Sequence, residues 1–183
     1  IATDLDLEII ENVEATVSRA GSTTISAHTL YDIIRKIPEG SFVEIEQKQD
    51  NQIELRSGQS NFDLPCLPDE DFPEMSSGEM PCSFTMGSND LARLIDKTKF
   101  AISTEETRYY LNGIFLHSID NELRSVATDG HRLACVKSKL PAGAEEMPSV
   151  IIPRKTVGEI RKLIEGSSDD LSIKVSDTKI QFN

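Results

Sequence analysis

The chain has 183 residues, a net charge of −12, 38% hydrophobic residues and 27% charged residues, which suits a soluble globular protein. No apolar run approaches the roughly 20 residues of a membrane span, and no signal peptide is visible in these residues. The three cysteines are widely spaced, which argues against a disulfide framework or zinc site and favours reduced thiols. The lack of Trp weakens the case for a single-strand binder that stacks bases.

The first predicted helix starts after Ser26, a favourable N-cap, and stops before Gly40. Its apolar face has the helical spacing i, i+3, i+4, i+7 and consists of Leu30, Ile33, Ile34 and Ile37. Residues 42–46 and 53–55 then alternate between apolar and polar side chains around a polar turn. This alternation predicts a hairpin of half-buried strands.

Two further helices are predicted in the second half of the chain. The first follows Ser88-Asn89-Asp90, and its apolar face consists of Leu91, Leu94, Ile95 and Thr98. The second starts at Pro153 and stops at Glu165-Gly166, with an apolar face of Val157, Ile160, Leu163 and Ile164. Alternation over 171–175 and 179–182 predicts another hairpin.

The order helix, Glu-Gly stop and hairpin occurs twice, and the two stops lie 126 residues apart. Ala2-Thr3-Asp4 recurs 125 residues later as Ala127-Thr128-Asp129. We therefore predict a duplicated unit of about 125 residues, an ordinary domain size. The chain opens inside this unit and stops on a strand, so we expect a fragment of a longer repeat protein, cut at both ends.

Charge is unevenly distributed between the predicted helices and the rest of the chain. Residues 27–38, 88–100 and 153–165 contain nine basic and five acidic residues, whereas the remainder contains ten basic and 26 acidic residues. Such segregation can focus a positive field on one surface for nucleic acid. Taken alone, the same pattern also fits an ordinary solvated helix face.

The octet Ala127–Ala134 combines a tight Asp-Gly turn with His131 and Arg132, beside an apolar run. It suggests either a docking bend or an acid–base pair of Asp129 and His131. The enzyme interpretation lacks a nucleophile motif and a phosphate-binding glycine loop. The chain's three histidines lack metal-ligand spacing, so neither a metal nor another cofactor is expected.

Together with this octet, several segments of the chain resemble the bacterial sliding clamp family, the beta subunit of the replicative DNA polymerase III holoenzyme. The matching segments occur in the family's order and are 3–5, 64–68, 71–73, 108–113, 127–134 and 149–155. The resemblance implies an α+β DNA-clamp fold of repeated domains, with antiparallel sheets outside and helices lining the inner face. It also implies three-domain subunits in a head-to-tail homodimeric ring, with residues 1–80 as the second part of domain I, residues 81–183 as most of domain II, and domain III absent.

The resemblance further implies a processivity factor that encircles double-stranded DNA and slides without sequence specificity. Sliding requires weak phosphate contacts without base readout. The expected DNA-facing residues are Arg35, Lys36, Arg93, Lys97, Arg108, Tyr109, Tyr110, Arg154 and Lys155. The tyrosines could instead be core aromatics, and His28 and Glu105 stand where family members can carry basic or amide contacts.

Sliding clamps also bind polymerase subunits, the clamp loader and repair proteins through a short peptide that contains a glutamine and bulky apolar residues. The resemblance places half of this pocket on Leu111, Thr128, Gly130, His131, Arg132 and Leu133. Core packing is the alternative for the two leucines, and a structural hydrogen bond is the alternative for His131. We expect a non-catalytic accessory subunit of the bacterial cytoplasm without membrane contact. The competing hypothesis is an interaction scaffold of the same fold that does not encircle DNA.

Overall fold

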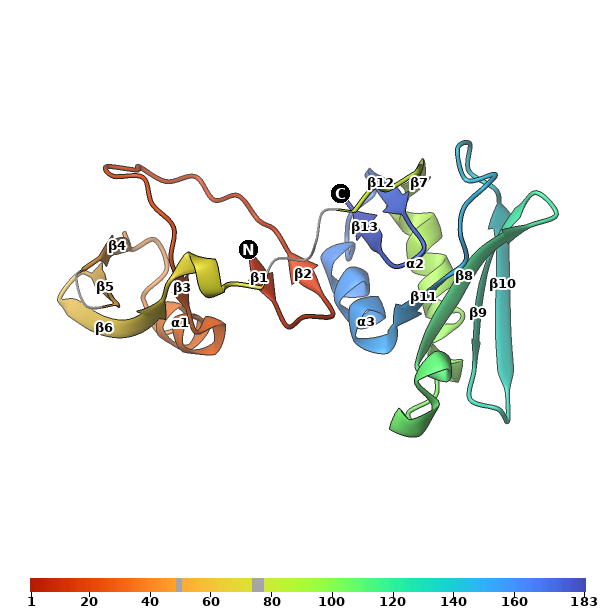
Figure 1. Ribbon diagram of the computed structural model, residues 1–183, viewed down its shortest axis with the longest axis horizontal. Coiled ribbons are helices and arrows are strands. Elements are labelled where there is room, and N and C mark those ends of the chain that lie inside the picture. The colour runs from red at the N-terminus through yellow and green to blue at the C-terminus, as the bar shows by residue number, and fades with distance from the viewer. Residues whose placement is uncertain (49–50, 74–77) are drawn as a thin grey trace. The chain divides into compact units, whose positions relative to one another are not determined.

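The computed structural model describes residues 1–48, 51–73 and 78–183. The chain divides into two compact units, Ile1–Ser76 and Ser77–Asn183, which we call unit 1 and unit 2 (Figure 1). Within the described residues, the strand pairings of both units are antiparallel, and the helices are few and short. Among the described residues, none of the helices has the length and apolar character needed to cross a membrane.

Unit 1 contains a four-stranded sheet in the order β3-β6-β5-β4, with one helix between β3 and β4. A separate two-stranded ladder joins β1 to β2 near the start of the chain. The elements are β1 (Ala2–Thr3), β2 (Glu8–Ile9), β3 (Thr24–Ile25), α1 (Ala27–Ile34), β4 (Glu44–Gln47), β5 (Gln52–Ser57), β6 (Ser60–Leu67) and the 3-10 helix η1 (Asp69–Asp71).

Unit 1 buries a small apolar core on its β5–β6 hairpin, made of Ile53, Leu55, Leu64 and Cys66. The predicted cap at Ser26 is confirmed, because the side chain of Ser26 accepts a hydrogen bond from Thr29 N at 3.4 Å. Helix α1 ends at Ile34, three residues before the end of the predicted apolar face. No residue of α1 is fully buried, so this helix covers its sheet only partly.

Unit 2 contains two sheets, β10-β9-β8-β11 and β13-β12-β7. Two α-helices lie side by side and pack against strands of both sheets (Figure 1). The elements are β7 (Cys82–Gly87), α2 (Ser88–Asp96), the 3-10 helices η2 (Lys99–Ala101) and η3 (Glu106–Leu111), β8 (Gly113–Ile119), β9 (Glu122–Thr128), β10 (Leu133–Lys139), β11 (Val150–Pro153), α3 (Arg154–Leu163), β12 (Asp170–Val175) and β13 (Ile180–Phe182).

The core of unit 2 is one continuous cluster that joins the apolar faces of α2 and α3 to the strands. The predicted apolar face of α2 is confirmed, because Leu91, Leu94 and Ile95 are buried. Helix α3 buries Val157 and Ile160 in the same cluster, with Ile164 just after it, whereas the prediction was wrong for Leu163, which is 68% exposed. Both helices therefore turn their remaining, polar faces to solvent.

One local prediction in unit 2 needs correction. Ser88 is not a residue before the helix, because α2 begins at Ser88 and its N-cap is Gly87. The Ser88 side chain is buried and donates a hydrogen bond to the carbonyl of Ser167 at 2.9 Å. Local sequence preference predicts a serine that precedes and caps the helix. In the structure, a tertiary hydrogen bond to the segment before β12 instead places Ser88 inside α2.

The predicted duplication is visible in matching turns. Ala2 pairs with Ile9 and Thr3 with Glu8, and residues 125 positions later repeat this register, since Ala127 pairs with Ala134 and Thr128 with Leu133. In both turns the threonine hydroxyl accepts from the backbone N–H two residues later, at 3.1 Å. The aspartate that follows accepts two further backbone N–H groups in each turn.

The two turns also share a left-handed residue, Leu5 at φ 81° and Gly130 at φ 89°. Leucine adopts this region at a steric cost, whereas glycine does not. The Glu-Gly stops match in the same way, with φ values of 79° at Gly40 and 76° at Gly166. The Thr-Asp turn is thus a structural device of the repeated unit, present in both copies.

Candidate docking and nucleic-acid-binding surfaces

The turn between β9 and β10 is held together by one carboxylate and one hydroxyl. Asp129 accepts hydrogen bonds from His131 N and Arg132 N, each at 3.0 Å, and from Arg132 Nε at 2.9 Å. The Thr128 hydroxyl donates to the Arg132 carbonyl at 2.7 Å and accepts from Gly130 N. These bonds fix the backbone from which His131 and Leu133 project.

The electrostatics of this turn argue against an acid–base pair. The backbone N–H of Arg132 and then that of His131 lower the pKa of Asp129 to about 2, and the Arg132 side chain adds to this effect. A carboxylate bound to amides and a guanidinium is a weak base at neutral pH. Asp129 therefore stabilises the turn and holds Arg132, as its equivalent Asp4 stabilises the turn of unit 1.

The structure brings the predicted pocket residues to one edge of unit 2. Gly130, His131, Arg132 and Leu133 are exposed, whereas Leu111 and Thr128 are half-buried. Leu133 is 66% exposed, so the alternative of core packing is wrong for this leucine. An apolar side chain displayed beside ordered polar groups is a suitable anchor point for a partner.

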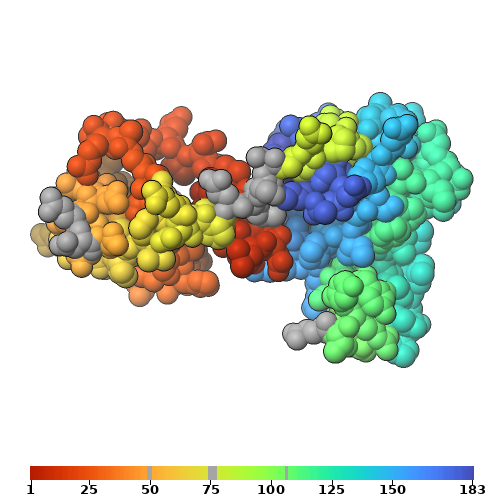
Figure 2. Space-filling view, in the orientation of Figure 1, coloured from red at the N-terminus to blue at the C-terminus, as the bar shows by residue number. Residues whose placement is uncertain are grey.

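The segment η3 lies at this edge in the structure, although it precedes the β9–β10 turn by about 20 residues in the sequence. A Cβ built on Gly130 would lie 3.3 Å from Arg108 Nη1, so the Arg108 guanidinium lies directly against the turn. Arg108 also forms an ion pair with Glu105 at 3.1 Å. Figure 2 shows η3 as a projection at one end of unit 2.

The two tyrosines of η3 are surface residues. Tyr109 is 80% exposed and Tyr110 is 56% exposed, so the interpretation as core aromatics is wrong for both. Their rings pack edge to face with centroids 5.7 Å apart. Two exposed rings on a projecting segment are available to an external ligand.

Sequence reasoning missed Phe100, which lies on η2 immediately after α2. Its ring is 57% exposed, and the Arg132 guanidinium carbon stands 5.6 Å from the ring centroid, in cation–π geometry. The sequence did contain one indication of its exposure, because Phe100 does not continue the helical spacing of the apolar face formed by Leu91, Leu94 and Ile95. Only the fold brings this ring to the β9–β10 turn.

Helices α2 and α3 carry four predicted DNA-facing residues on their solvent-exposed sides, namely Arg93, Lys97, Arg154 and Lys155. The Arg93 guanidinium donates to the Lys137 carbonyl at 3.4 Å and approaches Asp90 at 3.8 Å. These contacts orient the Arg93 side chain while leaving it 44% exposed. The basic groups thus lie opposite the buried apolar faces of the same helices.

Several other basic residues of these helices are engaged with acids of the same unit. Asp96 accepts bonds from Lys99 Nζ at 2.6 Å and from Arg161 Nε at 3.0 Å, and Lys162 pairs with Glu159 at 2.9 Å. Both acids are already included in the count of nine basic and five acidic residues, so the pairs leave that net charge unchanged. They instead hold three basic side chains on the protein, where each is less available to an external phosphate.

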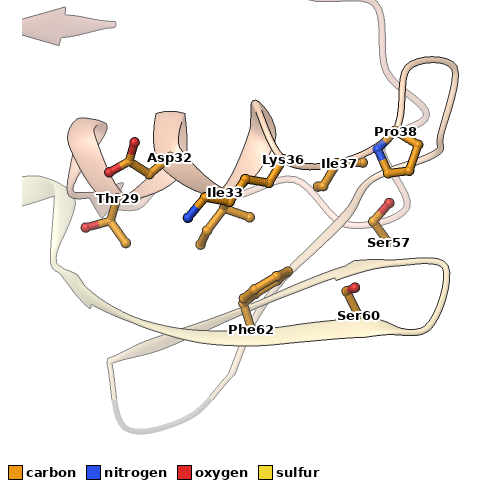
Figure 3. A pocket seen from close by; sticks show the side chains of 9 residues that line it. All are labelled: Thr29, Asp32, Ile33, Lys36, Ile37, Pro38, Ser57, Ser60 and Phe62. Carbon is orange, nitrogen blue, oxygen red and sulfur yellow. The ribbon is translucent and has the colours of Figure 1, made fainter.

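The remaining predicted DNA-facing residues, Arg35 and Lys36, belong to unit 1 and follow the end of α1. Arg35 lies over the ring of Tyr31 at 5.5 Å, and both basic side chains are exposed. Lys36 lines a hollow of about 330 Å³ between α1 and the β5–β6 hairpin. Ile33 and Phe62 point toward one another across this hollow (Figure 3). His28 is exposed on the same helix.

Among the described residues, no group of three or more His, Cys, Asp or Glu side chains is placed to hold a metal ion. His117 stacks on Phe115 with centroids 4.7 Å apart, and burial followed by the charge of Arg124 lowers its pKa. Cys66 and Cys82 are buried thiols and Cys135 is an exposed one.

The fold and the exposed residues define an α+β protein of duplicated units, with basic residues on its helices and an ordered turn beside the exposed Leu133. The family model of the DNA polymerase III beta subunit central domain matches residues 85–183, and the N-terminal domain model of the same subunit matches residues 1–76. The chain therefore belongs to the DNA polymerase III beta subunit family, and the resemblance drawn from its motifs is confirmed.

Sequence comparison with individual beta sliding clamps supports this family assignment. The beta sliding clamp of Caulobacter vibrioides (strain NA1000 / CB15N) is 47% identical over 186 residues, covering 99% of this chain and 50% of the relative. The beta sliding clamp of Escherichia coli (strain K12) is 36% identical over 182 residues, covering 98% and 49%. The chain thus spans about half the length of the curated relatives it matches.

A solved sliding clamp from Bartonella birtlesii, bound to griselimycin, superimposes with a TM-score of 0.94 at 48% identity, covering 100% of this chain and 50% of that one. Caulobacter crescentus pol III beta superimposes with a TM-score of 0.93 at 47% identity, covering 99% and 50%. The predicted α+β clamp fold is therefore confirmed.

Proposed function

We propose that this chain acts as part of a sliding clamp that encircles duplex DNA and tethers replication and repair proteins to it. The observation that carries the proposal is the two-faced character of α2 and α3. Each helix buries an apolar face in the core of unit 2 and displays basic residues to solvent, with Arg93 and Lys97 on one helix and Arg154 and Lys155 on the other.

Basic side chains on short helices suit a sliding contact. Lys and Arg attract phosphates regardless of sequence, so the contact energy changes little as the protein moves along the duplex. Asp96 and Glu159 hold three of the basic side chains in ion pairs, which keeps the attraction to phosphates weak. Arg108 and the exposed tyrosines of η3 extend the same function to a projecting segment, and Arg35 and Lys36 supply it in unit 1.

The second part of the proposal assigns partner binding to the edge formed by Leu111, Thr128, Gly130, His131, Arg132 and Leu133. Leu133 provides an exposed apolar anchor, and the Asp129-ordered turn holds polar groups beside it. A short peptide with a glutamine and bulky apolar residues fits this combination. The partners in this proposal are polymerase subunits, the clamp loader and repair proteins.

In the whole protein, this function belongs to a homodimeric ring in the bacterial cytoplasm that has no catalytic activity of its own. Units 1 and 2 correspond in this proposal to part of the first clamp domain and most of the second. The ring closes around DNA, so attachment is topological and tolerates weak individual contacts. The chemistry is carried out by the polymerase that the clamp tethers.

Retention on DNA tests the encircling function. The whole protein, labelled and loaded by its clamp loader, should remain on closed circular DNA and leave linear DNA through the free ends. Replacing Arg93, Lys97, Arg154 and Lys155 together by alanine should shorten retention on circular DNA. Equal retention on linear and circular DNA would contradict encirclement and favour an interaction scaffold.

Ligand binding tests the docking function separately. A fluorescein-labelled decapeptide that contains glutamine, leucine and phenylalanine should bind the whole protein, and a scrambled peptide should not. The variant Leu133→Asp should lose at least tenfold in affinity, because a charge replaces the apolar anchor. Griselimycin, which is bound to the Bartonella birtlesii clamp, serves as a competitor. Unchanged peptide binding by Leu133→Asp would exclude this edge as the site.

A further inference from the structure

The ring of Phe100 and the carboxylate of Asp129 hold the Arg132 guanidinium from two sides. The guanidinium carbon stands 5.6 Å from the ring centroid, and Nε donates to Asp129 at 2.9 Å. An arginine side chain has several rotatable bonds and loses considerable freedom when it is fixed in one geometry. Because two contacts from different elements already restrict the Arg132 side chain, less conformational entropy is lost when a partner binds it.

Phe100 stands on a rigid support. The neighbouring residues Thr98 and Ala101 are fully buried, and Ile102 is nearly so. The Thr98 hydroxyl donates to the Leu94 carbonyl at 2.6 Å and shares a hydrogen bond with Ser125 on β9 at 3.0 Å. The end of α2 is thereby tied to the strand that leads into the turn, while the Phe100 ring itself points outward.

The exposure of this pair distinguishes it from ordinary core packing. Phe100 is 57% exposed and the Arg132 side chain is 59% exposed, so neither is placed by burial. Of the five guanidinium N–H donors, the Nε donor is bound to Asp129, and the Nη groups carry the remaining four. The Arg108 guanidinium lies against the same turn, so this edge offers further N–H donors that suit an acceptor oxygen on a ligand.

We propose that Phe100 is a positioning residue of the peptide-docking edge. Its ring holds Arg132 in the orientation in which the Nη groups bind a carbonyl or carboxylate oxygen of the partner peptide. This inference rests on the proposed docking function, and it adds a residue that acts through Arg132 rather than by its own contact with the peptide. A cation–π contact at an exposed site is worth about 0.5–1 kcal/mol, or roughly twofold to fivefold in affinity.

The geometry can be tested without any ligand. In the nuclear magnetic resonance spectrum of the 183-residue chain, the Arg132 Nε–H proton should be shifted upfield by the Phe100 ring current. Phe100→Leu should abolish this shift, whereas Phe100→Tyr should keep it. Thermal unfolding of Phe100→Tyr should match that of the parent chain, and Phe100→Leu should unfold only a few degrees lower, as loss of one such contact requires. An Arg132 Nε–H resonance that is the same in parent and Phe100→Leu would overturn the proposal.

A double-mutant cycle tests the role in binding, with the labelled decapeptide and the whole protein. Phe100→Leu should weaken binding about threefold, and Phe100→Tyr should restore it. In an Arg132→Ala background, Phe100→Leu should cause no further loss, because the residue through which it acts is gone. An equal loss in both backgrounds would show a direct or purely structural role and overturn the inference.

The two proposals fail in different ways. If the parent protein does not bind the decapeptide, or if Leu133→Asp leaves binding unchanged, the docking function fails while the resonance test of Phe100 still stands. If the peptide binds and Leu133→Asp abolishes binding but the cycle shows no coupling, the docking function survives and the role of Phe100 is refuted.

Discussion

Asp96 at the end of α2 accepts two bonds from Arg161 of α3, with Nε at 3.0 Å and 3.1 Å from its two carboxylate oxygens. The same carboxylate accepts from Lys99 Nζ at 2.6 Å. One acid therefore joins α3 to the end of α2 and pairs with two basic side chains, and its single negative charge offsets one of their two positive charges. Helix association and the strength of the basic surface are coupled at this residue.

Asp96→Asn should reduce the stability of unit 2 slightly and raise its affinity for DNA. The Lys99 hydrogen bond, followed by that of Arg161, lowers the pKa of Asp96 below its ordinary value. Its contribution to stability is therefore present above the ordinary aspartate pKa and is lost as pH falls through the lowered one. Loss of a partly exposed ion pair of this kind costs about 0.5 kcal/mol. Urea unfolding at pH 7 and pH 3 measures the free energy of unfolding of the parent and the variant. The difference between them should be smaller at pH 3, and an equal difference at both pH values would contradict this account.

Gly130→Ala should destabilise unit 2 by about 1–2 kcal/mol. The backbone at Gly130 has φ 89°, where an L side chain is strained, and the new Cβ would meet Arg108 Nη1 at 3.3 Å. Gly158→Ala is the matched control, because Gly158 lies inside α3 with open space around it. That control should be neutral or stabilising by up to about 1 kcal/mol. Thermal unfolding of the two variants should shift in opposite directions.

The Asp129 carboxyl should titrate at a pKa of about 2 in the folded chain. Since this value lies below that of an unfolded aspartate, the carboxylate stabilises the turn above the unfolded pKa and ceases to do so as pH falls toward 2. The carboxyl carbon shift of Asp129, followed by nuclear magnetic resonance, measures the titration. Asp4 in the equivalent turn of unit 1 offers an internal comparison. A midpoint for Asp129 near that of a free aspartate would contradict the hydrogen-bonding scheme.

Lys97→Ala should weaken binding of the chain to duplex DNA and reduce the slope of log affinity against log salt by about one. Lys162→Ala is the control, because Lys162 Nζ is held in an ion pair with Glu159 at 2.9 Å and is therefore less available to a phosphate. We therefore expect a smaller change in salt slope for Lys162→Ala. Fluorescence anisotropy with labelled duplexes of two unrelated sequences makes the comparison. A sequence-dependent loss for Lys97→Ala would argue against a sliding contact.

Leu123→Ala should destabilise unit 2 by about 2–5 kcal/mol, because Leu123 is fully buried in its core and the shorter side chain leaves a cavity. The matched control is Leu55→Ala, since Leu55 is fully buried in unit 1. Each unit has its own buried residues, so each variant should lower only the stability of the unit that contains it. Hydrogen exchange resolved by residue separates the two effects.

Several features follow from residues close together in the sequence. The Ser26 cap, the apolar face of α2 and the paired strands at residues 44–47 and 52–57 appear in the structure where local patterns predict them. Burial is predicted less well, because no residue of α1 is buried, β4 is exposed where a half-buried strand was predicted, and Leu163 of the predicted α3 face is 68% exposed. The two Thr-Asp turns are predictable for the same reason, because a threonine hydroxyl and an aspartate carboxylate reach backbone amides two or three residues away. The motif resemblance to sliding clamps is likewise contained in the chain's own order of residues.

Features that join distant residues needed the tertiary structure. Phe100 meets Arg132, Arg108 meets Gly130, and Asp96 meets Arg161 only because the strands and helices of unit 2 close on one another. The sequence by itself determined the repeated units, their local elements and the family. Which basic residues are neutralised by an acid, and which aromatic and apolar side chains remain exposed, were decided by packing, because partner distance and burial depend on contacts that sequence separation does not encode.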